Sequence, residues 1–173
     1  IKESDYKTAF ESYTPEVTAQ IIKLDSEDKA KEVLEAAKAE GADFAKIAKD
    51  NSTDTATKDK GGEVKFDSGT ADIPSQVKEA SFKLDENGIS DVITVSAGQN
   101  YSASYYIVKL NKKTEKGSDW KKYEKRLKEI IVDGRKQDTN YIRSIIAKAM
   151  TNANIKVKDD AFKSTFNQYL QNI

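Results

Sequence analysis

The stretch Lys60-Gly61-Gly62-Glu63-Val64-Lys65-Phe66 decides how this 173-residue chain folds. Two adjacent glycines adopt positive φ without steric cost, so the backbone can reverse direction there. Val64 and Phe66 then alternate along the chain, which is typical of a short strand. We therefore expect a turn at the glycine pair and a strand that leaves it.

Hydrophobic patterning on both sides of this turn predicts a sheet with helices between its strands. Ser26 or Asp25 is expected to cap a helix that ends at Gly41, because these residue types favour helix boundaries. The expected elements are strands at 17–24, 64–66, near 91–95 and at 104–111, and helices at 26–41, 44–48 and 74–84. This order predicts an α+β fold with one four-stranded, antiparallel-rich sheet packed by helices.

The two ends of the chain are predicted to be helical. A charged linker at 112–118 precedes Asp119, which is expected to cap a long helix that Gly134 weakens by about 1 kcal/mol. Its apolar positions are Trp120, Tyr123, Leu127, Ile130 and Ile131, continued by Tyr141, Ile142, Ile145, Ile146 and Ala149. A last helix is expected from Asp159 or Asp160, and a first one within 1–14. Such amphipathic helices need a partner surface for their apolar faces.

Composition narrows the chemistry of this chain. It has no histidine, which removes the usual general base and the usual metal ligand, and no cysteine, which removes thiolate chemistry. Residues 1–113 hold 16 basic and 21 acidic side chains, a net charge of −5, whereas 114–173 hold 13 and 8, a net charge of +5. The split favours two different units. Basic and acidic residues are interleaved, which argues against a nucleic-acid partner, and no apolar run approaches a membrane span.

The segments that follow one another along the chain resemble a parvulin-type peptidyl-prolyl isomerase domain in order and spacing. With its helical tail, the whole chain is similar to the PrsA-type foldase family of Gram-positive bacteria in its streptococcal form. The segments that carry the resemblance are Val17-Thr18-Ala19-Gln20-Ile21-Ile22, Ser52-Thr53-Asp54, the glycine stretch, Ile73 to Leu84, Gly88 to Ile93 and Tyr105 to Leu110.

The resemblance implies an isomerase-type domain at 15–113, with 1–14 and 114–173 as parts of a helical chaperone lobe. It implies unfolded or partly folded secreted polypeptides as partners and no cofactor. It also implies that the full-length protein is attached to the outer face of the cell membrane through a lipid anchor that these residues lack. Ile1 already lies within sequence that is expected to fold, so we expect a fragment of a longer protein. A homodimer through the helices is an alternative way to bury their apolar faces.

The site of the parvulin family consists of two histidines, a Cys or Asp, and an apolar pocket. The resemblance places the catalytic positions at Gln20, Asp54 and Tyr106. It places the substrate-binding positions at Val64, Phe66, Ile73, Val77 and Phe82. Gln20 and Tyr106 can hydrogen-bond one another, but neither titrates near neutral pH. The alternatives are that both are ordinary interior polar residues and that Asp54 only shapes a turn. No metal site is expected.

Three functions remain open from the sequence. The first is a foldase or holding chaperone whose isomerase-type domain binds prolyl segments with weak or no catalysis. The second is a working prolyl isomerase without histidine, and the third is a cell-surface interaction module. We expect the first, because two histidine positions are replaced and the pocket position at Val77 lacks an aromatic ring.

Overall fold

The computed structural model describes residues 1–96, 98 and 102–153. The chain forms two compact units: one comprises Ile1–Ser12 and Asp119–Ile173, and the other Tyr13–Ser118. We call them the helical unit and the sheet unit. The helix predicted from Asp159 or Asp160 lies outside the described residues.

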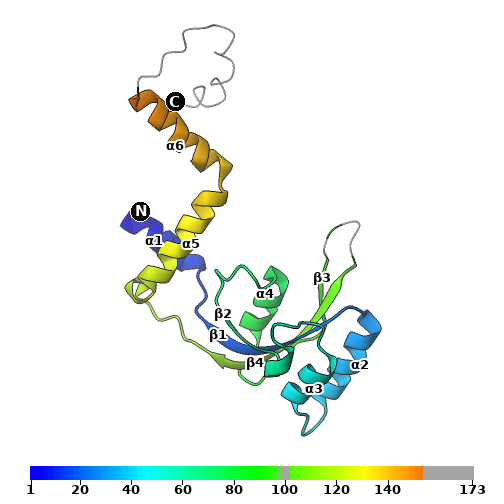
Figure 1. Cartoon of the computed structure of the whole chain (residues 1–173). Helices are drawn as coiled ribbons and strands as arrows, with labels where there is room; N and C mark the ends of the chain where they lie inside the picture. The colour runs from blue at the N-terminus through cyan, green and yellow to red at the C-terminus, as the bar shows by residue number, and fades with distance from the viewer. Residues whose placement is uncertain (97, 99–101, 154–173) are drawn as a thin grey trace. The chain divides into compact units, whose positions relative to one another are not determined.

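The sheet unit is built on four antiparallel strands, as the alternating sequence predicts. They are β1 (Val17–Leu24), β2 (Glu63–Phe66), β3 (Ile93–Val95) and β4 (Ser104–Lys113), in the order β2-β1-β4-β3 (Figure 1). Because β1 and β4 are central, they bury residues on both faces. The α+β class and the antiparallel sheet are thus confirmed, and β4 extends two residues into the predicted linker.

Helices pack on both faces of this sheet (Figure 1). One face is covered by α2 (Glu27–Lys38), which Ser26 caps as predicted, and by α3 (Phe44–Asn51), which Asp43 caps. The other is covered by α4 (Ser75–Lys83). Ile22, Leu24 and Ile107 face α2 and α3 with Ala30, Val33, Ala37, Phe44 and Ala48. The cluster on the other face, which we call the α4 cluster, buries Val17, Ala19, Ile21, Phe66, Val77, Val108 and Leu110.

The glycine pair forms the predicted turn, directly after a 3-10 helix at Lys58–Lys60. Gly61 and Gly62 have φ of 67° and 78°, a region that other residues avoid. The Gly62 carbonyl accepts a hydrogen bond of 2.8 Å from the Ile21 backbone N–H. A Cβ on Gly62 would collide with the Ile21 carbonyl oxygen, so this position also needs the close approach that only glycine allows.

The helical unit joins the two ends of the chain. α1 (Glu3–Ser12) lies against the 3-10 turn η2 (Trp120–Tyr123) and α5 (Glu124–Gln137). Tyr6 stacks on Trp120 with ring centres 5.1 Å apart, and Phe10 stacks on Tyr123 at 5.9 Å. The backbone N–H of Lys2 and then the Arg135 guanidinium, 2.7 Å away, lower the pKa of Asp5.

The prediction of one long helix beyond Asp119 is wrong. Asp119 caps the short turn η2, and the helical path then breaks at Asp138, whose carboxylate accepts from the backbone N–H groups of Asn140 and Tyr141 and so starts α6 (Thr139–Asn152). Gly134, the residue expected to weaken the helix, lies inside α5. A side chain that satisfies two N–H groups at a helix start competes directly with helix continuation.

Candidate functional site

All predicted substrate-binding residues gather on the α4 face of the sheet. Phe66 and Val77 are buried in the α4 cluster, and Val64, Ile73 and Phe82 pack against it. The rings of Phe66 and Phe82 lie 5.8 Å apart and are tilted by 48°. β2 supplies Val64 and Phe66, and α4 with its preceding loop supplies Ile73, Val77 and Phe82. One apolar surface is thus assembled from two consecutive elements of the chain.

Burial divides these residues into two groups. Phe66 and Val77 are 1% and 0% exposed, so they support the surface from below and offer nothing to a ligand. Val64, Ile73 and Phe82 are half-buried and keep part of their apolar area open. Any pocket for a proline ring on this face is therefore lined by the half-buried group, with the buried pair fixing its floor.

Tyr106 belongs to the same face, since it packs against the α4 cluster. It lies opposite Lys23 on β1 and Ile93 on β3. Burial raises the pKa of the Tyr106 hydroxyl, and the carboxylates of Asp54 and Asp25 raise it further. At neutral pH the hydroxyl is therefore a neutral hydrogen-bond donor beside an apolar surface.

Asp54 is held in a turn beside β1. Its carboxylate accepts from the Ala56 backbone N–H at 3.1 Å and from the Thr57 hydroxyl at 2.7 Å, which is the turn chemistry considered above. The Ser52 hydroxyl accepts from the backbone N–H groups of Lys23 and Asp54, which fixes the turn to the strand. Because Asp54 also acts on the pKa of Tyr106, the fold brings these two predicted residues into one neighbourhood.

Gln20 makes a different contact from the hydrogen bond with Tyr106 that its side chain could form. The Gln20 side-chain amide donates to the Gly61 carbonyl at 3.0 Å. Its neighbour Ile21 packs in the α4 cluster, and adjacent strand residues point to opposite faces, so Gln20 lies on the α2 and α3 side. The β1 residue on the face of Tyr106 is thus the apolar Ile21, because a shift of one residue changes the face.

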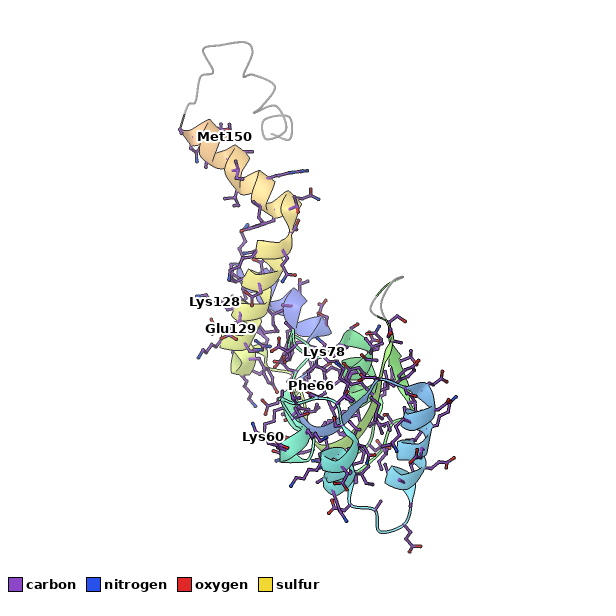
Figure 2. The ribbon with its side chains drawn as sticks, turned by 45° about the vertical axis from the view of Figure 1, so that its right-hand side comes forward. Lys60, Phe66, Lys78, Lys128, Glu129 and Met150 are labelled. Carbon is purple, nitrogen blue, oxygen red and sulfur yellow. The ribbon has the colours of Figure 1, made fainter. Side chains whose placement is uncertain are left out.

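Sequence reasoning missed Lys23, Asp25 and Lys78. Lys23 follows Ile21 at strand spacing, so the same alternation that places Ile21 on the α4 face signals it. Asp25 lies just past the end of β1, close enough for its carboxylate to raise the pKa of Tyr106. Lys78 on α4 donates from Nζ to the carbonyls of Ser68 at 3.0 Å and Thr70 at 2.6 Å (Figure 2). It ties the loop that leads to Ile73 onto the helix that carries Val77, and no periodicity announces such a contact.

Neither a cluster of metal-ligand side chains nor a membrane-spanning helix is found in the part of the chain that the structure describes. Within residues 1–96, 98 and 102–153, no three carboxylate, thiol or imidazole side chains come together as metal ligands would. In the same part of the chain, no helix combines the length and apolar character needed to cross a bilayer.

Comparison with known proteins gives consistent matches over this region and beyond it. The family described as the PPIC-type PPIASE domain matches residues 10–116. Foldase protein PrsA of Streptococcus sanguinis is 64% identical over 171 residues, which cover 99% of this chain and 51% of that protein. Among solved structures, foldase protein PrsA of Streptococcus pneumoniae matches with a TM-score of 0.90 and 55% identity, over 98% of this chain and 62% of that one.

The PrsA foldase structure of Lactococcus lactis matches with a TM-score of 0.76 at 36% identity, over 97% of this chain and 60% of that one. The chain spans about half the length of the curated relatives it matches, 51% to 55% of each. The similarity therefore covers both units of this chain but only part of each longer relative.

Proposed function

Because the chain belongs to the PPIC-type peptidyl-prolyl isomerase domain family, we propose that it is the prolyl-binding part of an extracytoplasmic foldase for secreted proteins. In this proposal residues 15–113 bind proline-containing segments, and 1–14 and 114–173 are parts of a helical chaperone lobe. The longer protein is held at the outer face of the cell membrane by a lipid anchor. The names of the streptococcal relatives support the foldase role.

One observation carries the proposal: an apolar surface of the right kind stands beside a site that lacks the two histidines of the parvulin pattern. Rotation about an X-Pro bond faces a barrier of about 18–20 kcal/mol, and a catalyst must bind the twisted amide better than the planar one. Val64, Ile73 and Phe82 suit a proline ring, whereas the polar groups that face the α4 side include only Tyr106 and Asp54 of the predicted set. Binding therefore persists while isomerisation is weak or absent.

The helical unit supports a chaperone role by a separate route. Tyr141, Ile142 and Ile145 on α6 are 36%, 41% and 47% exposed, and they line a groove of about 340 Å³. Exposed apolar area of this kind is usual at interaction sites. We assign it to unfolded or partly folded client segments, with a second copy of the chain as the alternative occupant.

The test is suppression of aggregation of a chemically unfolded secreted protein by an excess of this chain. Ile145→Asp removes apolar area from the groove, and Lys148→Asp, an exposed position on the same helix, is the matched control. The proposal predicts that the wild type and Lys148→Asp suppress light scattering and that Ile145→Asp does so less. A wild-type chain without effect on aggregation overturns the chaperone role. Light scattering of the chain alone across concentration distinguishes self-association.

A further inference from the structure

The outer edge of β2 borders a groove. Among the residues that the structure describes, β2 is the last strand on its side of the sheet and pairs with β1 alone. A groove of about 350 Å³ runs beside it, lined by Lys60, Glu63, Val64 and Lys65. Figure 2 labels Lys60 and Phe66, which bracket the segment. Free strand edges offer unpaired backbone groups to another extended chain.

The pairing with β1 shows which backbone groups point into this groove. The bond from the Ile21 N–H to the Gly62 carbonyl makes that pair a hydrogen-bonded one. In an antiparallel ladder hydrogen-bonded and non-bonded pairs alternate, and the register continues as Gln20 with Glu63 and Ala19 with Val64. Glu63 and Lys65 are consequently non-bonded toward β1, and their N–H and C=O groups face outward.

The side chains of β2 divide in the matching way. Val64 packs against the α4 cluster, whereas Glu63 and Lys65 alternate to the opposite face. In an antiparallel strand added at this edge, residues opposite Glu63 and Lys65 would exchange backbone hydrogen bonds with them. The residue opposite Val64 would turn its own N–H away from β2 and its side chain toward the α4 face.

Proline fits that middle position. It has no N–H to donate, so it is tolerated in a strand only where the N–H would point away from the neighbour. Its ring would lie on the α4 face beside Val64, where the half-buried Ile73 and Phe82 belong to the same apolar surface. The residues before and after it would carry the backbone hydrogen bonds, whatever their side chains.

We propose that a client segment adds to β2 as an antiparallel fifth strand, with a proline opposite Val64 and its two neighbours paired to Glu63 and Lys65. This inference rests on the proposed function and specifies how the same site holds its ligand. In strand addition the main-chain hydrogen bonds supply the affinity, so many sequences around the proline can bind. A short edge with four residues keeps the complex weak and reversible.

The test variant is Lys65→Pro, with Lys65→Ala as its matched control. Proline at 65 removes an outward N–H and places its ring in the groove, but it breaks no bond to β1, and edge strands accept it. Alanine removes the ammonium group and keeps the N–H. The probe is a seven-residue peptide with a central proline, titrated into the isotopically labelled full chain and followed by NMR.

We expect Lys65→Pro to weaken peptide binding about tenfold or more, since a client-facing hydrogen bond and access to the edge are lost together. Lys65→Ala, which keeps the outward N–H, should lose far less binding than Lys65→Pro. A second measurement uses the wild-type chain with peptides N-methylated on the residue after proline, which should lose binding, or on a terminal residue, which should not.

Equal binding by Lys65→Pro and the wild type overturns strand addition and leaves the prolyl-binding role standing. Equal weakening by Lys65→Ala and Lys65→Pro overturns it too, because the ammonium group would then carry the binding. If Lys65→Pro fails to fold, the N-methylated peptides still test strand addition on the wild-type chain. A wild-type chain that binds no proline peptide overturns the proposed function together with this inference.

Discussion

Substitution of Gly62 by alanine is the sharpest perturbation that this fold offers. Gly62 combines a φ of 78° with a backbone contact so close that a Cβ would meet the Ile21 carbonyl oxygen and lie 3.0 Å from the Ile21 nitrogen. Gly41 has a similar φ of 72° and no atom within 4 Å of the same Cβ position. The pair separates backbone strain, which both alanines share, from steric overlap, which only one creates.

The expected costs follow from these contacts. Left-handed backbone costs an alanine about 1–2 kcal/mol, and Gly41→Ala should pay only that. In Gly62→Ala the turn must also move away from β1, which breaks the 2.8 Å hydrogen bond from Ile21. Leaving that N–H unpaired costs about 1–3 kcal/mol more, since Ile21 is only 4% exposed. The sheet unit should therefore lose about 2–5 kcal/mol, a large share of a typical stability of about 5–15 kcal/mol.

The assay is urea unfolding followed through backbone amide NMR signals of β1 and β4, which report on the sheet unit alone. With a slope of about 1–3 kcal/mol per molar urea, the midpoint of Gly62→Ala should fall about 1 M below that of Gly41→Ala. Equal midpoints for the two variants would refute the claim that close approach at Gly62, beyond its φ, holds the turn onto β1.

Three further outcomes are expected. Asp54→Asn should move the phenolate titration of Tyr106 to lower pH, measured as the difference in absorbance between chains with Tyr106 and with Tyr106→Phe. Because the pKa of Tyr106 is raised in the fold, its contribution to stability is complete below pH about 10 and is lost as pH rises through its own titration. An unchanged titration would show that Asp54 does not act on the pKa of Tyr106. Asp138→Ala should destabilise α6 by about 0.5–2 kcal/mol and speed amide hydrogen exchange in its first turn. Unchanged exchange would show that Asp138 does not cap α6. Since the pKa of Asp5 is lowered, its stabilising contact is present above pH about 3.9 and lost as pH falls further; Trp120 fluorescence should report this in the wild type and not in Asp5→Asn.

The strands and the turn were predictable because their signals are local. Gly61 and Gly62 adopt the positive φ that a glycine pair invites, and each long strand follows a run of β-forming residues. The face of β1 was harder to assign. Ile21 and Ile22 are both buried because β1 is central and covered on its two sides, so the alternation that would identify the pocket face is interrupted there.

The face on which Gln20 lies is hidden by that interruption. Its half-buried position and polar amide suit a site, but the hydrogen bond to Gly61 shows a structural use on the other face. The break at Asp138 was hidden for a related reason. Apolar spacing continues from α5 into α6, and a glycine within the run is a more conspicuous breaker than an aspartate, although Asp138 has the capping chemistry to start a new helix.

The burial of Phe66 and Val77 could not be predicted from spacing, since a pocket wall and a pocket floor share the same apolar residues. Only the packing of α4 against the sheet, mainly against β3 and β4, decides which side chains keep exposed area. The Ser52 contact with Lys23 and the pairing of Lys23 with Tyr106 bring Asp54 toward Tyr106, although the two residues lie far apart in the sequence and share no local motif.

Exchange NMR of a proline tetrapeptide in the presence of this chain tests the central claim most directly, because one experiment reports binding and catalysis together. The account predicts that the NMR signals of Val64, Ile73, Phe82 and Tyr106 shift as peptide is added. It also predicts that cis-to-trans exchange keeps its uncatalysed time constant of about tens to hundreds of seconds. Rapid exchange at substoichiometric chain, abolished by Asp54→Ala, would contradict it and show a working isomerase that needs no histidine.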